Sequence, residues 1–154
     1  MREDQGDIWE AYNSGCWIVI PTNKCVKKNG EAVMGRGLAL QAKQRFPCLP
    51  LDLGQAIKDV GAYVYAFMRY RLIVFPVKND WRANADLKLI EEGCKQLLTV
   101  VNDDIHHAFF GPVYIPRVGC GYGQLDWKDV KPILEKYLDD RFIVIDYHYD
   151  LGES

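Results

Sequence analysis

Two glycine-bearing segments, about eighty residues apart, contain the residues whose types and spacing point most directly to chemistry. One spans 33–40 and reads Val-Met-Gly-Arg-Gly-Leu-Ala-Leu; the other spans 115–123 and reads Ile-Pro-Arg-Val-Gly-Cys-Gly-Tyr-Gly. Each adjoins an apolar run and leads toward an amphipathic stretch, which predicts a loop that presents backbone N–H groups near a helix N-terminus. Phosphate binds well to such groups. The pair of loops therefore predicts a site that holds a diphosphate from both sides.

The composition indicates one folded unit with no overall attraction for polyanions. The chain has 154 residues, of which 49% are hydrophobic and 12% aromatic, enough for the core of one domain. We therefore expect residues 1–154 to form a single domain. The formal net charge of −2 provides no global field, so an anionic ligand must be held by local groups.

The cysteine usage is typical of a reducing compartment. The five cysteines are an odd number, show no Cys-x-x-Cys spacing and come without a signal-peptide pattern, so we expect a cytoplasmic protein. No apolar run approaches the roughly 18–20 residues that a membrane span needs, and we expect no membrane partner. The short polar tail 150–154 indicates no further interaction domain, and a monomer is expected.

Predicted strands and helices alternate along the chain, and they must position the two loops. Short apolar runs rich in β-branched residues predict strands, whereas apolar residues at three- and four-residue spacing predict helices. The predicted strands 62–67 and 72–75 are separated by a polar turn, and we expect them to form a hairpin. The alternation predicts an α/β fold with a mixed, mostly parallel sheet covered on both faces. The predicted strands are 16–20, closed by Pro21, 62–67, 72–75, 113–115 and 142–145, and the predicted helices are 37–46, 86–101 and 126–138.

Six short motifs occur in a fixed order along almost the whole chain. They are Gly6-Asp7-Ile8, Thr22-Asn23, Met34-Gly35-Arg36-Gly37-Leu38-Ala39, Phe75-Pro76-Val77-Lys78 with Trp81-Arg82, the second glycine segment from Pro116 to Gly123, and Leu125-Asp126-Trp127. Together they resemble the macro domain family, and within it the branch that removes ADP-ribose from proteins or DNA. The resemblance implies a three-layer α/β/α fold around a mixed sheet, with ADP-ribose in a cleft at the strand ends. That placement agrees with the general rule for open α/β sheets.

The resemblance implies how the two ends of ADP-ribose are bound. Asp7 resembles the acid that accepts a hydrogen bond from the adenine amino group, and Ile8 resembles a neighbouring backbone donor. Asn23 resembles the asparagine that contacts the distal ribose, where an amide can both donate and accept. The alternative for Asp7 and Asn23 is an ordinary turn residue.

The resemblance also assigns the diphosphate to the two glycine segments. Gly35 and Gly37 resemble the first phosphate loop, where the absence of a Cβ lets the backbone approach the ligand. The second phosphate loop would present its N–H groups to the diphosphate, and Tyr122, flanked by glycines, is expected to be exposed at the pocket. Helix-capping glycines and a tight turn are the alternatives. The second loop consists of Gly119, Cys120, Gly121, Tyr122 and Gly123.

Lys78 is the candidate catalytic residue. A lysine at the matching place is catalytic in the ADP-ribosyl hydrolase branch, and the motif with Trp81 and Arg82 is most similar to members that act on ADP-ribosylated DNA. A lysine amine can attack C1″ of the opened distal ribose, or its ammonium can stabilise negative charge as the bond breaks. A solvated surface lysine is the alternative.

Two departures from the family pattern bear on the substrate. Some members that act on proteins have an aspartate where this chain has Gly123, whereas the DNA-directed members share the glycine. Ile20 replaces the first asparagine of the usual Asn-x-x-Asn stretch, and the insertion 27–31 lengthens the loop before Met34. Asn29 is a candidate replacement amide, although an Asn-Gly pair is primarily a turn signal.

Other chemistries have weaker support. His106 and His107 lack partners at ligand spacing, so we expect no metal site and no cofactor. Cys120 has no recognisable His/Asp pair and is expected to be a packing residue rather than a nucleophile. A basic cluster around the first loop is a candidate contact for a nucleic-acid backbone, with a solvated face as the alternative.

The leading hypothesis is an enzyme that hydrolyses an ADP-ribosyl adduct and releases ADP-ribose from a protein or nucleic acid. The expected partner is ADP-ribose or an ADP-ribosylated macromolecule, with nucleic acid as one possible modified substrate. The alternatives are a phosphatase acting on ADP-ribose 1″-phosphate, a module that binds ADP-ribose without turnover, and a purely structural protein.

Overall fold

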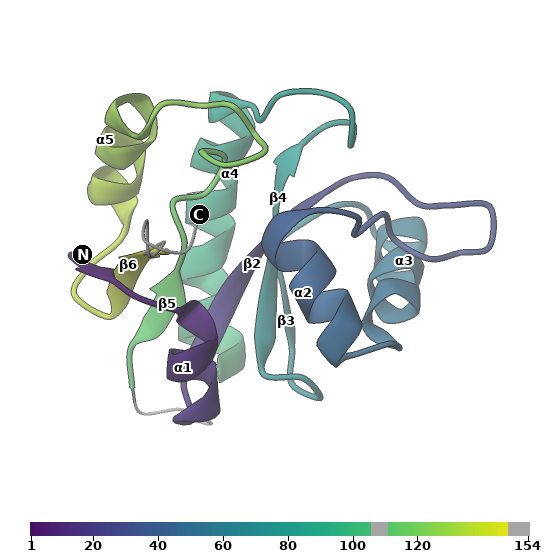
Figure 1. Ribbon diagram of the computed structural model, residues 1–154, viewed down its shortest axis with the longest axis horizontal. Coiled ribbons are helices and arrows are strands. Elements are labelled where there is room, and N and C mark those ends of the chain that lie inside the picture. The colour runs from purple at the N-terminus through teal and green to yellow at the C-terminus, as the bar shows by residue number, and fades with distance from the viewer. Residues whose placement is uncertain (106–110, 148–154) are drawn as a thin grey trace, which may run out of the picture.

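A six-stranded mixed sheet lies at the centre of the protein (Figure 1). The structure is a computed structural model and describes residues 1–105 and 111–147. The strand order is β1-β6-β5-β2-β4-β3, and within these residues every neighbouring pair is parallel except β3 and β4. The predicted hairpin is that antiparallel pair. The strands are β1 (Arg2–Gln5), β2 (Trp17–Asn23), β3 (Tyr65–Phe67), β4 (Leu72–Lys78), β5 (Val113–Ile115) and β6 (Phe142–Asp146).

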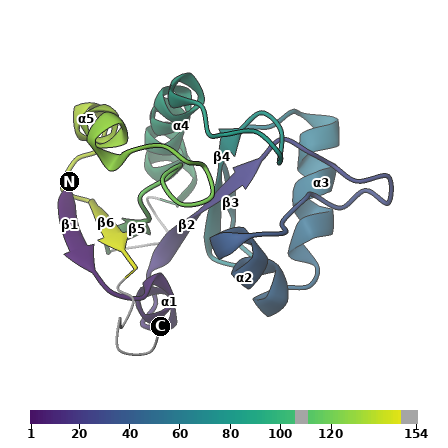
Figure 2. The same cartoon turned by 45° about the horizontal axis from the view of Figure 1, so that its top comes forward.

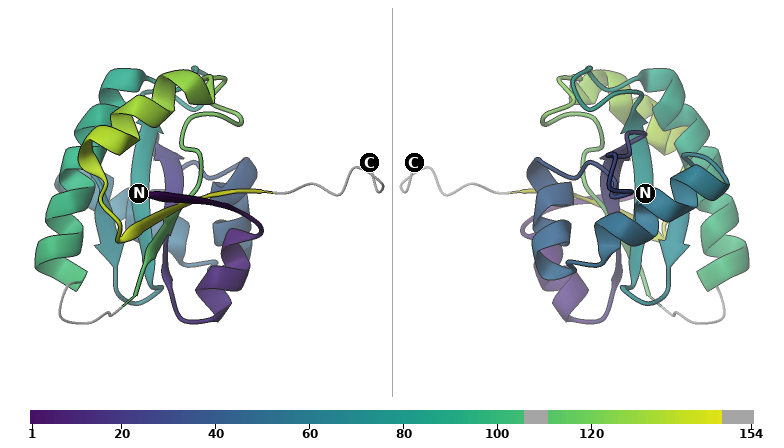
Figure 3. Two further views of the ribbon diagram at one scale, coloured as in Figure 1. Left: turned by 90° about the vertical axis from the view of Figure 1, so that its left-hand side faces the viewer. Right: turned by 90° about the vertical axis from the view of Figure 1, so that its right-hand side faces the viewer.

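Helices cover both faces of the sheet, so the predicted three-layer α/β/α fold is confirmed (Figure 3). One face carries α1 (Ile8–Asn13), α2 (Gly37–Arg45) and α3 (Leu49–Asp59). The other carries α4 (Leu87–Val100), which continues as a π-helix over Val101–Ile105, and α5 (Trp127–Tyr137). No helix among the described residues is long and apolar enough to cross a membrane.

Alternate residues of the central strands supply the two halves of the core. In β2, Trp17 and Val19 pack with the α4 and α5 side, whereas Ile18 and Ile20 pack with the α1 to α3 side. Successive side chains of a strand point to opposite faces, so a strand buried on both faces must be apolar throughout. This explains why the central strands read as continuous apolar runs.

The structure corrects the predicted end of β2. The strand does not close at Pro21 but continues to Asn23, with Pro21 in register with Phe75 of β4. Since β2 pairs with β5 only through Trp17 and Ile18, it has a strand partner on one side at Pro21, where a residue without an N–H is tolerated. The extension carries Asn23 to the same sheet edge as Lys78.

Three elements have no counterpart in the sequence prediction: β1, α1 and α3. The four residues of β1 are polar and exposed, so they show no apolar pattern. Helix α3 has a proline in its first turn and Gly54 in its interior, which is an unfavourable helix residue. A Cβ on Gly54 would overlap the carbonyl oxygen of Gly30, so the glycine lets the insertion 27–31 pack directly on this helix.

Candidate active site

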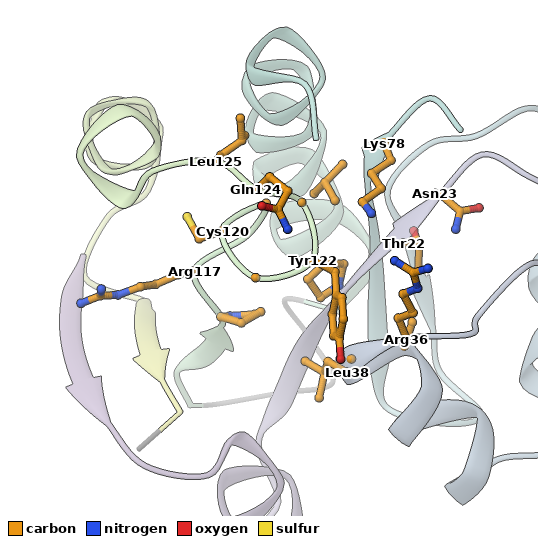
Figure 4. A pocket seen from close by; sticks show the side chains of 18 of the residues that line it. Thr22, Asn23, Arg36, Leu38, Lys78, Arg117, Cys120, Tyr122, Gln124 and Leu125 are labelled. Carbon is orange, nitrogen blue, oxygen red and sulfur yellow. The ribbon is translucent and has the colours of Figure 1, made fainter. Parts of the chain in front are cut away.

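A cleft of about 1100 Å³ lies at the carboxyl ends of β2, β4, β5 and β6 (Figure 4). The loop that follows β2 and the loop that follows β5 supply its two walls. Figure 2 shows the course of these two loops beyond the ends of the strands. This is the place where ligands bind in open α/β sheets. The cleft contains most of the predicted site: Asn23, Gly35, Gly37, Lys78, Gly119, Cys120, Gly121, Tyr122 and Gly123.

The first wall ends in a helix N-terminus that lacks a side-chain cap in the described structure. Aspartates at positions 7, 86 and 126 accept a backbone N–H at the starts of α1, α4 and α5, whereas Arg36 before α2 makes no such bond. Gly37, Leu38 and Ala39, the first three residues of α2, line the cleft. Because the first N–H groups of a helix have no intrahelical partner, those of α2 are available to an anion.

In the second wall, three glycine carbonyl groups are hydrogen-bonded to the protein, whereas several backbone N–H groups are not hydrogen-bonded to any described residue. The carbonyls of Gly119, Gly121 and Gly123 accept hydrogen bonds at 2.9, 3.1 and 2.9 Å from backbone N–H groups nearby. Within the described residues, the N–H groups of Gly121, Tyr122 and Gly123 donate to no backbone carbonyl. The two walls therefore present unpaired N–H groups from two segments about eighty residues apart.

The glycines of the second loop have two different reasons to be glycine. Gly119 has φ +78°, and a Cβ there would lie 2.9 Å from Cδ1 of Ile90. A Cβ on Gly123 would overlap the carbonyl oxygen of Gly119 and lie 2.8 Å from Cβ of Ala85. Gly121 has no atom within 4 Å of its Cβ position. Gly119 and Gly123 thus allow the loop to pack tightly on its neighbours, whereas Gly121 leaves open space that a ligand can enter.

The same packing explains one departure from the family pattern. An aspartate at position 123 needs a Cβ that this loop has no room for. A catalytic acid at that position is therefore excluded by the local backbone, independently of any resemblance.

The two walls touch each other at Tyr122. Its ring lies 5.7 Å from the Arg36 guanidinium, and a Cβ on Gly37, which has φ +56°, would lie 3.3 Å from Cδ2 of the ring. Figure 4 shows Tyr122 reaching from the second loop toward Leu38 at the start of α2. The side chain is 59% exposed, as expected for a tyrosine between glycines.

Lys78 is the last residue of β4, and its amine points into the cleft (Figure 4). Burial lowers the pKa of Lys78 below its ordinary value, and the positive charge of Arg36 lowers the pKa further. Both effects disfavour the ammonium form. A lysine with a lowered pKa is a better nucleophile near neutral pH than a fully solvated one.

Asn23 lies beside Lys78 in the β2–β4 register, at a point where the register shifts. Its Nδ2 donates to the carbonyl oxygen of Val33 at 3.1 Å, and its Oδ1 accepts from the N–H of Cys25 at 2.9 Å. Asn23 therefore lines the cleft while its amide holds the two ends of the first loop together.

Asp7 and Ile8 do not line this cleft. Asp7 accepts from the N–H of Trp9 at 2.9 Å as the cap of α1, and Ile8 is 7% exposed in the core. Asp7 instead lines an adjacent hollow of about 370 Å³, and Tyr147 lines both hollows. Their predicted adenine contacts stay predictions, with Asp7 near the β6 end of the cleft.

The structure adds cleft residues that no motif had singled out. Asp146 is the last residue of β6 and Tyr147 comes directly after it; the only sequence signal for them is their place at a strand end. Asp146 lies 3.7 Å from a guanidinium nitrogen of Arg117, whose guanidinium carbon lies 5.0 Å from the ring centroid of Trp127. Asn29 is absent from the residues that line the cleft in the described structure; its amide bonds to Glu31 within a turn.

Thiol and metal chemistry have no support in the described cleft. Burial raises the pKa of the Cys120 thiol to about 11, which disfavours a thiolate at neutral pH. No group of three or more His, Cys, Asp or Glu side chains that could hold a metal occurs in residues 1–105 and 111–147. His106 and His107 lie outside the described residues.

Comparison with known proteins completes the assignment. No protein-family model matches the chain. A DNA ADP-ribosyl glycohydrolase of Mycobacterium tuberculosis is 32% identical over 130 residues, which are 78% of this chain and 36% of that protein. The solved macrodomain of Mycobacterium tuberculosis DarG has a TM-score of 0.75 and 28% identity, covering 97% of each chain. The macrodomain of Thermus aquaticus DarG has a TM-score of 0.72 and 26% identity, covering 96% of this chain and 97% of that one.

The fold and the cleft define an α/β domain with a ligand site at the strand ends of its sheet. The chain belongs to the macro domain family, on the branch of the DarG macrodomains. It spans about a third of the length of the curated relatives it matches.

Proposed function

We propose that this domain binds ADP-ribose and hydrolyses an ADP-ribosyl adduct on DNA, releasing ADP-ribose. The observation that carries the proposal is the opposition of two sets of unpaired N–H groups across one cleft, with Lys78 in the same cleft. Backbone N–H groups at a helix start and in a glycine loop favour phosphate oxygens. The choice of DNA follows the name of the Mycobacterium tuberculosis relative.

The cleft supports one direction for the ligand. The diphosphate lies between Gly37 and Gly121, the distal ribose lies toward Lys78, and the adenosine lies toward Tyr147 and Asp7. The volume of the cleft, about 1100 Å³, is slightly larger than the roughly 300–1,000 Å³ of most small-molecule sites, which leaves room for more than free ADP-ribose.

The lowered pKa of Lys78 favours a nucleophilic role. With the distal ribose opened between C1″ and O4″, the neutral amine adds to C1″. The bond from C1″ to the adduct atom then breaks, the adduct leaves with a proton given up by the amine, and C1″ is left double-bonded to the Lys78 nitrogen. Water adds to C1″ and the amine leaves, so C1″ becomes an aldehyde that closes on the O4″ hydroxyl; this regenerates Lys78 and releases ADP-ribose. The loops contribute by holding the distal ribose in one orientation.

The proposal includes a monomer in the cytoplasm. One chain supplies both walls and Lys78, and its five cysteines are free thiols, as in a reducing compartment. Size-exclusion chromatography with light scattering tests the monomer, and a mass near 17.7 kDa is expected.

Binding is tested first by isothermal titration with ADP-ribose, with AMP as the competitor. We expect ADP-ribose to bind well above AMP, and a ligand at ~100 times its dissociation constant to add about 2.7 kcal/mol of stability. Absence of ADP-ribose binding would refute the proposal. Turnover of an ADP-ribosylated oligonucleotide and of ADP-ribose 1″-phosphate then separates the hydrolase from the phosphatase.

Lys78→Ala tests the chemistry separately from binding. We expect turnover to fall by roughly 10²–10⁴-fold, a range typical of losing a group that acts in the transition state, while ADP-ribose binding persists. Lys78→Arg is the matched control, because arginine keeps the positive charge but is not deprotonated. An inactive arginine variant supports amine attack, and an active one supports charge stabilisation instead. Unchanged turnover in Lys78→Ala would remove Lys78 from the mechanism.

A further inference from the structure

The segment that joins β4 to α4 places a large aromatic side chain just beyond Lys78. Trp81 comes three residues after Lys78, lines the same cleft and is 42% exposed. The guanidinium of Arg82 lies 5.7 Å from the Trp81 ring centroid. Single exposed aromatics are common on protein surfaces, but this one borders the position proposed for the bond that breaks.

Hydrogen bonds tie this segment down on both sides of Trp81. Arg82 donates through Nε and Nη2 to the two carboxylate oxygens of Asp80, each at 3.1 Å, and its N–H bonds to the same carboxylate at 2.9 Å. The N–H of Ala85 bonds to the carbonyl of Gly123, and that of Asp86 to the carbonyl of Val77, both at 2.9 Å. The indole is therefore presented by a preformed segment that is anchored to the second glycine loop.

The group that leaves from C1″ must lie on the far side of that atom from the diphosphate. In the proposed ligand direction the diphosphate lies between the two loops and C1″ lies at Lys78, so the leaving group would occupy the part of the cleft beyond Lys78. Trp81, three residues after Lys78, lines the same cleft. An indole face suits a flat heteroaromatic ring, and base–aromatic stacking tolerates every base because each has a π-face. An amino-acid side chain offers no such face in most protein adducts.

The charge around this end of the cleft fits a nucleic acid as well. Lys27 and Arg36, both exposed, line the cleft from the first wall. Positive side chains at a site mouth contact phosphodiester groups without reading sequence. A nucleic acid with one base on Trp81 would enter a cleft whose first wall carries these two positive side chains.

We propose that Trp81 is a specificity-determining residue, a platform on which the nucleobase that carries the ADP-ribosyl group stacks. This inference rests on the proposed function. It assigns the preference for a nucleobase adduct over an amino-acid adduct to the indole ring, separately from the chemistry of Lys78.

The experiment compares two substrates and several variants. Steady-state kinetics are measured with an ADP-ribosylated single-stranded oligonucleotide and with a peptide ADP-ribosylated on a carboxylate, and free ADP-ribose binding is measured by titration. For Trp81→Ala we expect kcat/KM on the oligonucleotide to fall about tenfold, mainly through KM, as loss of one stacked base predicts. Activity on the peptide and affinity for ADP-ribose should change less than about twofold. Trp81→Phe, which keeps a flat ring, should retain most of the oligonucleotide activity.

Tyr63→Ala is the matched control, since Tyr63 is 48% exposed and is not among the residues that line the cleft in the described structure. It should leave all three readouts unchanged. The inference is overturned if Trp81→Ala leaves oligonucleotide kinetics unchanged, if it weakens both substrates and ADP-ribose equally, or if the unmodified protein prefers the peptide. An unmodified protein that binds no ADP-ribose would instead refute the proposed function itself.

Discussion

The two glycine loops to which we assign the diphosphate are built differently. In the first loop Gly35 has open space around its Cβ position, and the loop ends in a helix start without a side-chain cap. In the second loop Gly119 and Gly123 have no room for a side chain, and only Gly121 faces open space. One wall is an open helix terminus, whereas the other is a tightly packed turn.

The difference teaches that glycines in similar motifs serve separate purposes. A glycine in open space matters for what enters the cleft, so a substitution there should affect binding and leave folding intact. A glycine without room for a Cβ matters for the loop itself, so its substitution should affect stability first. Mutations in the second loop can separate the two purposes within five residues.

Of the substitutions that test this comparison of the two loops, Gly121→Glu should have the largest effect. The carboxylate would enter the space proposed for the diphosphate and repel it, so ADP-ribose affinity should fall on the order of a hundredfold or more, equivalent to about 2.7 kcal/mol. The melting temperature should stay within about 2 °C because nothing lies within 4 Å of the Cβ position. Titration and thermal melting check both expectations. Normal affinity in this variant would show that the pocket is wrongly placed.

Gly123→Ala should reverse this pattern. Its Cβ would overlap a backbone oxygen, which cannot shift cheaply, so we expect a loss of about 1–3 kcal/mol and a melting temperature lower by several degrees. Gly121→Ala is the matched control in the same loop and should melt like the unmodified protein. If both alanine variants melt at the same temperature, the distinction between a glycine that leaves open space and a glycine that has no room for a Cβ is wrong.

The smallest effect is expected from Arg36→Gln in the first wall. The positive charge of Arg36 contributes to the lowered pKa of Lys78, so its removal should raise that pKa. If the neutral amine is the active form, the rise of kcat with pH moves to higher pH and activity at pH 7 falls. If the ammonium is the active form, activity persists to higher pH. A pH–rate profile of the unmodified protein and of Arg36→Gln shows which protonation state of Lys78 is active. An unshifted profile would contradict the effect of the Arg36 charge on the pKa of Lys78.

The sequence predicted the elements with strong local patterns. The strand 113–115 and the helical stripe of α4 appear within one residue of their predicted bounds. The two glycine segments and Lys78 line one cleft, as expected for loops at the carboxyl ends of neighbouring parallel strands. Such patterns depend on residues a few positions apart, which the sequence displays directly.

The elements that were missed lack such patterns. The residues of β1 are polar because this strand lies at the sheet edge, where β6 is its only strand partner among the described residues. Helix α3 is stabilised by tertiary burial of Leu49 and Leu53, while Pro50 and Gly54 weaken its local signal. The separation of Asp7 from the main cleft also depends on how α1 packs, which no motif records.

The sequence by itself determined the alternation of strands and helices, the two glycine loops and the lysine at a strand end. Only the tertiary structure decided which glycines pack and which leave space, that Arg36 acts on Lys78, and that Trp81 borders the same cleft. The physical reason is that these properties arise from contacts between segments far apart in the chain. Strand order and helix packing bring those segments together, and neither is written in any local pattern of residues.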